Sequence, residues 1–345
     1  MARTRYVQRA LACQECAADH AHQDACDRPS TGQPCKHCIR NNKPCTPPPE
    51  EELLEHFATL RPSLVPRRID TTFKDAINAH VMRINAIFCA VMQFAALNKG
   101  ATHINIANKY NAKRHYFYRQ WTDSHTTSSW PEDVKPYLLY LLLLGPTLVA
   151  MNKSPNTRFN RNPAVHMAMI NRALCIAWGR VTQHLDLVPE DSVYSKLLSS
   201  NLLKGVPITG ENLDTAKPVV ALRAVLDKQG LSQEANKNLY LAITNSYRVL
   251  AAMICADGEV EDGRPNDINR WIPAWLSVNS DFNDDFWNAV NVDDPSDVFR
   301  IIQGFSGTLF HRAGVWWCEG ISDLLFDDFR GRLHANPGLR TPEYM

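Results

Sequence analysis

Six cysteines within residues 13–45 constrain this chain more than any other feature of its sequence. They are spaced as Cys13-x2-Cys16-x9-Cys26-x8-Cys35-x2-Cys38-x6-Cys45. The segment that carries them is too short and too polar to bury a hydrophobic core, so it needs cross-links or metal ions in order to fold. The other four cysteines are scattered singly through apolar stretches, as is typical of ordinary buried thiols. These are Cys89, Cys175, Cys255 and Cys318.

The choice between disulfides and metal depends on the compartment. Residues 1–12 are polar and contain arginines, without the apolar stretch of a secretory signal. We therefore expect an intracellular chain, in which clustered cysteines are metal ligands rather than disulfides. The most apolar run, residues 137–151, is shorter than the roughly 20 residues that a membrane-spanning helix needs. We expect it to be a buried core helix, and we expect no membrane partner.

The spacing of the cysteines indicates how many ions they hold. Each C-x-x-C pair can place two thiolates on one ion from a single turn, and more distant cysteines then complete the tetrahedron that zinc prefers. Four thiolates satisfy one zinc, whereas six satisfy two only if two sulfurs bridge both ions. The pattern thus predicts a binuclear zinc cluster, or one zinc with spare cysteines. His20 and His22 are either substitute ligands or exposed polar residues of a lengthened loop.

Residues 26–45, CDRPSTGQPCKHCIRNNKPC, resemble the second half of the six-cysteine binuclear zinc cluster of fungal transcription regulators. The shared features are an acidic residue after the third cysteine, a proline-bearing loop, a C-x-x-C pair and a six-residue gap. The resemblance implies that Cys13 and Cys35 bridge two zinc ions. One zinc would be completed by Cys16 and Cys26, and the other by Cys38 and Cys45. It also implies a nuclear, DNA-binding transcription regulator with double-stranded DNA as its partner.

The first half of the module departs from the family. Nine residues, AADHAHQDA, separate Cys16 from Cys26, where the family has six and fills them with the lysines and arginines that read DNA. Carboxylates at Glu15, Asp19 and Asp24 would weaken binding to phosphates. The basic residues that remain in the module are predicted to contact phosphates without specifying bases. They are Arg28, Lys36, Arg40 and Lys43. The alternative is a zinc-stabilised protein-interaction module without sequence-specific DNA binding.

The rest of the chain is predicted to be helical. Residues 47–52, PPPEEE, indicate a stiff, solvated linker. Apolar residues at three- and four-residue spacing then predict a helix from Thr72 to just before Gly100, and similar stretches recur as far as residue 329. The predicted fold class is mainly α: a zinc-binding module at 1–46, the linker, and a large all-helical domain at 53–345, of one or two lobes, that binds protein partners.

Two further patterns in the predicted helical domain bear on nucleic-acid binding and on dimerisation. Residues 108–121 interleave basic with aromatic side chains, as single-stranded nucleic-acid surfaces do. We favour an amphipathic helix with its aromatic residues in the core. Residues 53–60 make barely one heptad, so the sequence does not support a coiled-coil dimer. No phosphate-binding glycine loop, H-E-x-x-H motif or nucleophile elbow is present, and we expect no enzyme.

Overall fold

A computed structural model describes residues 3–19, 23, 25–28, 33–60, 67–124 and 130–151. It also describes residues 165, 167, 169–170, 172–174, 316–321, 323–325 and 327. These residues contain helices and no strand, which confirms the mainly-α prediction. The chain forms two compact units: residues 1–62 with 68–143, and residues 63–67 with 144–345. The predicted division into a zinc-binding module at 1–46, a linker at 47–52 and a helical domain at 53–345 stays a prediction. In the second unit the described residues include the end of a long helix and a short 3-10 turn, η6, Trp316–Cys318.

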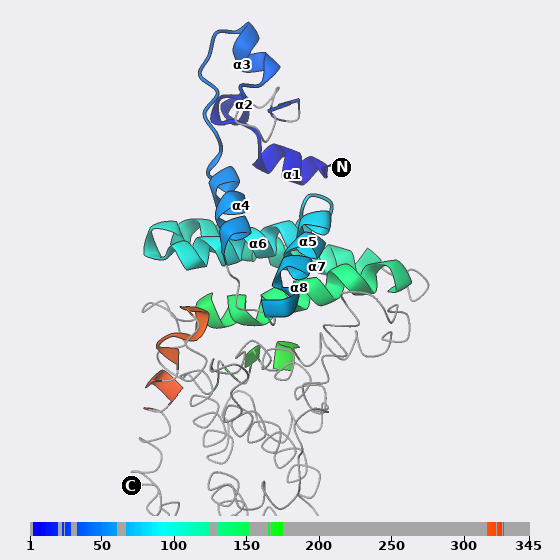
Figure 1. Cartoon of the computed structure of the whole chain (residues 1–345), viewed down its shortest axis with the longest axis vertical. Coiled ribbons are helices and arrows are strands. Elements are labelled where there is room, and N and C mark those ends of the chain that lie inside the picture. Colours follow the sequence, from blue (N-terminus) through cyan, green and yellow to red (C-terminus); the bar gives the residue numbers. More distant parts are fainter. Residues whose placement is uncertain are drawn as a thin grey trace, which may run out of the picture. The chain divides into compact units, whose positions relative to one another are not determined.

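Three short helices carry the cysteine segment: α1, Arg5–Ala10, α2, Gln14–Ala18, and α3, Lys36–Arg40 (Figure 1). Each begins at a side chain that accepts a hydrogen bond from a backbone N–H of the first turn, which satisfies a donor that the helix leaves free. The capping residues are Thr4, Cys13 and Cys35. Two of the three caps are therefore cysteines of the predicted metal site.

The helix α4, Pro49–Thr59, begins inside the segment predicted to be a linker. Pro49 occupies its first turn, where the fixed backbone of proline favours a helix start, and Glu50, Glu51 and Glu52 follow it. Acidic residues in a first turn interact favourably with the positive end of the helix dipole. The acidic run is only partly solvated, because Glu50 is 5% exposed whereas Glu52 is exposed. The helix α4 therefore includes the acidic half of the segment predicted to be a linker.

The helix predicted from Thr72 to Gly100 is two helices: α5, Arg67–Val81, and α6, Asn85–Lys99. The chain leaves helical geometry at residues 82–84, where Ile84 is extended. Here the backbone N–H of Thr4 donates to the Met82 carbonyl at 3.0 Å. The predicted stop is confirmed, since α6 ends at Gly100, whose φ of 89° favours glycine.

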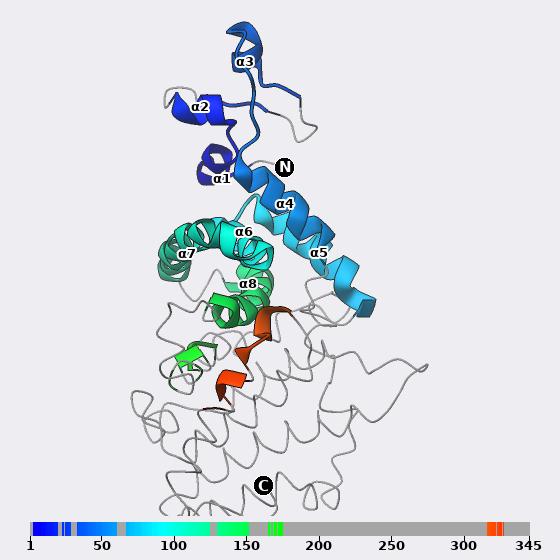
Figure 2. The same cartoon turned by 90° about the vertical axis from the view of Figure 1, so that its left-hand side faces the viewer.

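The centre of the first unit is α6, which packs against α4, against α1 and against α7, Ile104–Ser124 (Figure 2). The 3-10 turn η1, Ala101–His103, joins α6 to α7. Every residue from 86 to 96 is buried. Aromatic rings meet edge to face across these contacts, with centroids 6.2 Å apart for Phe57 and Phe94 and 6.0 Å apart for Phe88 and Tyr110.

The apolar run falls in α8, Trp130–Met151. The helix continues through Gly145-Pro146, two residues that disfavour a helix interior. Residues 136–147 are buried, as expected of a core helix, and their packing holds the helix together although proline removes one of its hydrogen bonds. Among the helices of the described residues, none is long and apolar enough to cross a bilayer.

The cysteine segment is attached to this helical core through Tyr6 of α1. Its ring lies edge to face with Phe88 at 6.1 Å and with Phe117 at 4.5 Å, and its hydroxyl oxygen accepts from the Cys89 thiol at 3.7 Å. Val7, on the same short helix, is fully buried. The first helix of the chain thus belongs to the core of the helical body, and it leads directly into the first cysteine.

Candidate metal centre

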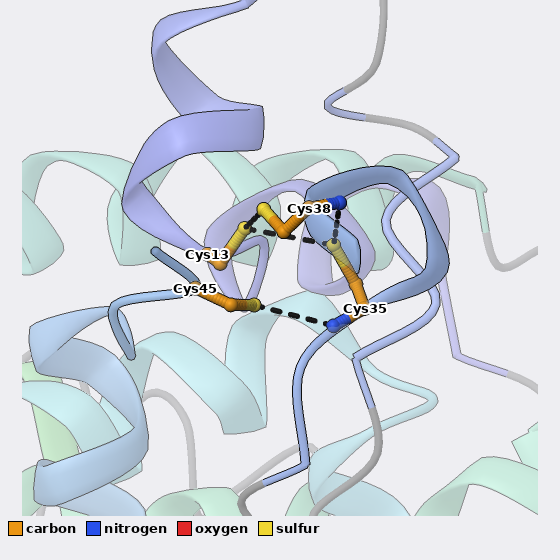
Figure 3. A group of neighbouring side chains, drawn as sticks. All are labelled: Cys13, Cys35, Cys38 and Cys45. Atoms are coloured by element: carbon orange, nitrogen blue, oxygen red, sulfur yellow. Dashed lines mark hydrogen bonds between the residues drawn. The ribbon is translucent and has the colours of Figure 1, made fainter. Parts of the chain in front are cut away.

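All six cysteines of the segment come together as free thiols. Their sulfurs form two sets of four, and within each set all sulfurs lie within 4.8 Å of one another. One set is Cys13, Cys16, Cys26 and Cys35; the other, shown in Figure 3, is Cys13, Cys35, Cys38 and Cys45. Cys13 and Cys35 belong to both sets. The structure therefore groups the cysteines as the family resemblance implied.

The sulfur separations match those of a tetrahedral site. A zinc–thiolate bond of about 2.3 Å places the sulfurs of a tetrahedron about 3.8 Å apart. The Cys13 sulfur lies 3.9 Å from that of Cys35, 3.6 Å from that of Cys38 and 3.9 Å from that of Cys26. The Cys16 and Cys35 sulfurs are 3.6 Å apart. Each set surrounds a space of the size that one zinc ion occupies, so the residues present fit this metal.

The two halves of the module repeat the same local geometry. Cys13 Sγ accepts from the Cys16 N–H at 3.4 Å, and Cys35 Sγ accepts from the Cys38 N–H at 3.4 Å. The last cysteine of each half then accepts from the backbone N–H of the capping cysteine: Cys26 from Cys13 at 3.5 Å, and Cys45 from Cys35 at 3.3 Å. Sequence analysis missed this repeat because its gaps are nine and six residues long, whereas the shared C-x-x-C pair could have indicated it.

Burial of the sulfurs makes the site dependent on positive charge. Desolvation raises the pKa of the Cys13 and Cys16 thiols. Burial also opposes ionisation of Cys35, but hydrogen bonds, first of all from the Cys38 N–H, lower the pKa of this thiol. Metal ligation needs thiolates, and a bound cation stabilises several of them in one buried cluster. The donor set and its spacing thus suit a divalent, thiolate-binding metal.

Carboxylates of the module serve its internal structure. The Asp27 side chain accepts from the Lys36 N–H at 2.9 Å, and this hydrogen bond holds the pKa of Asp27 below its usual range. Glu15 accepts from the Thr46 N–H at 2.9 Å and from the Thr46 hydroxyl at 2.7 Å. Asp19 Oδ2 lies 3.9 Å from His37 Nε2. Of the carboxylates that we expected to repel phosphates, Glu15 and Asp19 thus contact other protein groups, whereas Asp24 lies outside the described residues.

The four predicted phosphate-contacting residues lie in two different environments. The Lys36 side chain is 86% exposed, and Arg40 and Lys43 are exposed. Arg28 is only 8% exposed, and its Nη1 lies 2.8 Å from Glu51 Oε2. Burial against Glu51 leaves Arg28 little surface for a phosphate, whereas the other three remain accessible. His20 and His22 lie outside the described residues.

The basic and aromatic stretch at 108–121 lies within α7. Tyr110 is fully buried, as the amphipathic interpretation predicts. Arg114 differs from that interpretation, because it is 1% exposed rather than solvated. Its guanidinium donates to the side-chain oxygens of Gln93, Tyr140 and Asn111, each at 2.9 Å. One face of this stretch therefore belongs to the core, whereas Lys113, Tyr116 and Arg119 are exposed.

Comparison with protein-family models, with curated proteins and with solved structures finds no match to this chain. The geometry by itself defines the class of site: a compact, cysteine-only cluster that is compatible with a zinc-binding module and is attached to a helical body.

Proposed function

We propose that this protein is a zinc-dependent, DNA-binding transcription regulator whose cysteine module holds two zinc ions. The observation that carries the proposal is the sharing of Cys13 and Cys35 by the two sets of four sulfurs. Six thiolates complete two tetrahedra only when two of them bridge. A cysteine-only site with four protein ligands for each ion is typical of structural zinc and keeps no position open for a reacting water. The metal would therefore fold the module rather than catalyse a reaction.

Zinc is the metal that best suits this environment. Thiolates select zinc, copper(I) and iron–sulfur clusters, and tetrahedral sulfur sites are typical of zinc or iron. Separate cysteine tetrahedra that share an edge require no inorganic sulfide, and Sγ–Sγ distances of 3.6–3.9 Å accommodate bare ions. A segment this small is unfolded without its metal, so loss of zinc would also remove the surface that the module presents.

Double-stranded DNA is the proposed partner. Lys36, Arg40 and Lys43 are exposed, and all belong to α3 or to the residues that follow it. Basic side chains on one short segment neutralise successive phosphates, which supplies affinity without base specificity. Arg28 is left out of this proposal because of its contact with Glu51. Action in the nucleus follows from the resemblance of residues 26–45 to the fungal regulators.

One observation favours a second function, that of a zinc-stabilised protein-interaction module. The helix α2 contains Glu15, is followed by Asp19 and has no lysine or arginine, although the family places its DNA-reading lysines and arginines between the second and third cysteines, at a helix start. In this alternative the module is a structural cap on the helical body, and the body binds protein partners. The two functions differ in whether the exposed basic residues bind DNA.

The deciding experiment uses the full chain. Native mass spectrometry counts the zinc ions, and fluorescence anisotropy then measures binding to a generic duplex at several salt concentrations. The variant K36A/R40A/K43A is compared with R83A/K113A/R119A, which removes the same charge from exposed positions on the helical body. We expect two zinc ions and salt-sensitive binding that only the first variant loses. One zinc ion would overturn the binuclear site, and two ions without DNA binding at low salt would favour the interaction module.

A further inference from the structure

The two halves of the cysteine module share their geometry but carry opposite charges. The helices α2 and α3 both begin at a capping cysteine, and each buries the second cysteine of its C-x-x-C pair. The helix α2 is followed by Asp19 and contains Glu15, whereas α3 contains Lys36 and Arg40 and no carboxylate. The acidic side chains in and beside α2 contact other protein groups. Glu15 accepts hydrogen bonds from Thr46, and Asp19 Oδ2 lies 3.9 Å from His37 Nε2. Of these two helices, only α3 therefore presents positively charged side chains to solvent.

An exposed isoleucine lies among these basic residues. Ile39 is 64% exposed, which makes it one of the few large apolar side chains that the described residues expose. Lys36, Ile39 and Arg40 are three and four residues apart, so they share one face of the helix. The chain then turns back at Asn42, with φ 48°, and the Lys43 N–H donates to the Cys38 carbonyl at 2.9 Å. Lys43 is thereby held beside the end of α3.

These four residues, Lys36, Ile39, Arg40 and Lys43, are called the α3 surface. Its charge is partly offset by a neighbour, because Asp27 Oδ2 lies 3.3 Å from Lys36 Nζ, whereas Arg40 and Lys43 form no ion pair with a carboxylate within the described residues. The cluster cysteines Cys35 and Cys38, at the cap and within the helix, are buried. Figures 1 and 2 show α3 at the end of the first unit away from α6 and α7.

We propose that α3, and not α2, is the element that enters the major groove of duplex DNA. In this arrangement Ile39 contacts thymine methyl groups. Lys36, Arg40 and Lys43 hold the phosphates on either side. This inference rests on the proposed DNA-binding function. The major groove is about 12 Å wide and admits a helix, and the thymine methyl is the apolar group that it displays. A protein partner is less well matched, because aromatic anchors in desolvated pockets dominate protein interfaces. The α3 surface has one aliphatic side chain among three long cations.

The test separates the apolar contact from the charges. Full-length, zinc-loaded protein is titrated with a pool of random-sequence duplexes containing thymine, and with the same pool made with uracil, which lacks the methyl group. Ile39→Ala is compared with Tyr116→Ala, which truncates an exposed aromatic side chain on α7. Zinc content and circular dichroism confirm that each variant is folded.

We expect Ile39→Ala to weaken binding to thymine-containing DNA by at least about threefold, and to have little effect on uracil-containing DNA. The dependence of affinity on salt stays unchanged in this variant, since no phosphate contact is lost. In K36A/R40A the slope of log affinity against log salt falls by about 2. Tyr116→Ala binds both pools as the unchanged protein does.

Each contradictory binding result identifies which part of the proposal is wrong. DNA binding that Ile39→Ala leaves unchanged in both pools overturns the role of α3 while leaving the proposed function intact. Absence of DNA binding by the unchanged protein at low salt overturns the proposed function together with this inference. Binding to poly-glutamate that depends on Ile39, without binding to either duplex pool, replaces DNA by an acidic protein partner on the same surface.

Discussion

Arg28 Nη1 lies 2.8 Å from Glu51 Oε2, which joins the cysteine module to the first turn of α4. Both side chains are mostly buried, with 6% and 20% of their surface exposed. Arg28 follows the ligand Cys26 by two positions, so the ion pair connects the metal centre directly to the helical body. Arg28 Nε and Nη1 are both buried without a hydrogen-bond partner within the described residues, so the charge contact with Glu51 is the main compensation for burying this guanidinium.

Replacing Arg28 with methionine is expected to weaken this connection. The change leaves Glu51 without its cation, and losing one partner of a mostly buried pair costs about 1–3 kcal/mol in the free energy of unfolding. Hydrogen exchange of the zinc-loaded full chain measures the loss as reduced protection of residues 49–59. The matched control is Glu55→Gln, at an exposed position of the same helix. The double variant R28M/E51L should be less destabilised than the sum of its single changes; additive effects would mean that the two side chains are not coupled.

Glu50 and Glu52 are adjacent on either side of Glu51 but differ in burial. Glu50 Oε1 accepts from Lys109 Nζ at 2.8 Å and from the Tyr110 hydroxyl at 2.7 Å, and Glu50 is buried. The Glu52 side chain is 64% exposed and pairs with Lys99. We expect Glu50→Gln to destabilise the contact between α4 and α7 by about 1–3 kcal/mol, because a buried charged hydrogen bond is lost. Glu52→Gln should cause no measurable change. Denaturant midpoints followed by circular dichroism compare the two variants, and equal effects would contradict the difference in burial.

Bridging by Cys13 and Cys35 predicts unequal effects of single cysteine changes. Cys26 and Cys45 each belong to one set of four sulfurs, whereas Cys13 and Cys35 belong to both. Cys26→Ser should therefore keep one zinc ion in the presence of a competing chelator, and Cys13→Ser should keep none. Native mass spectrometry counts the ions that remain. Cys89→Ser, a buried cysteine of α6 outside both sets, serves as the control that retains two. Equal retention by Cys13→Ser and Cys26→Ser would exclude bridging.

The grouping of the cysteines into two sets that share Cys13 and Cys35 could be predicted only through the family resemblance, because the spacing alone left open one zinc with spare cysteines. The stop at Gly100 was encoded locally. The break between α5 and α6 was not encoded locally. It coincides with the hydrogen bond from the Thr4 N–H to the Met82 carbonyl, and these two residues are far apart in the chain. The burial of Glu50 and Arg28 was missed for the same reason, because their partners lie on other segments. Predicted helices between 191 and 256 lie outside the described residues.

The buried guanidinium of Arg114 provides a test of the helical core itself. It is 1% exposed and donates to oxygens on α6, α7 and α8, namely those of Gln93, Asn111 and Tyr140. Within the described part of the chain its partners include no carboxylate. The planar fork of arginine reaches three helices at once, whereas a lysine ammonium is a compact charge that cannot span them.

We therefore expect Arg114→Lys to destabilise the first unit by about 2–4 kcal/mol, since the buried charge remains but loses most of its acceptors. Arg114→Met should be less harmful than Arg114→Lys, because it removes the charge while filling much of the same volume. Hydrogen exchange of residues 85–99 and 104–124 measures both effects in the full chain. Arg119→Lys, at an exposed position of α7, is the matched control and should leave exchange unchanged. If the lysine variant of Arg114 were as well protected as the unchanged protein, the three-helix contact would contribute nothing to stability.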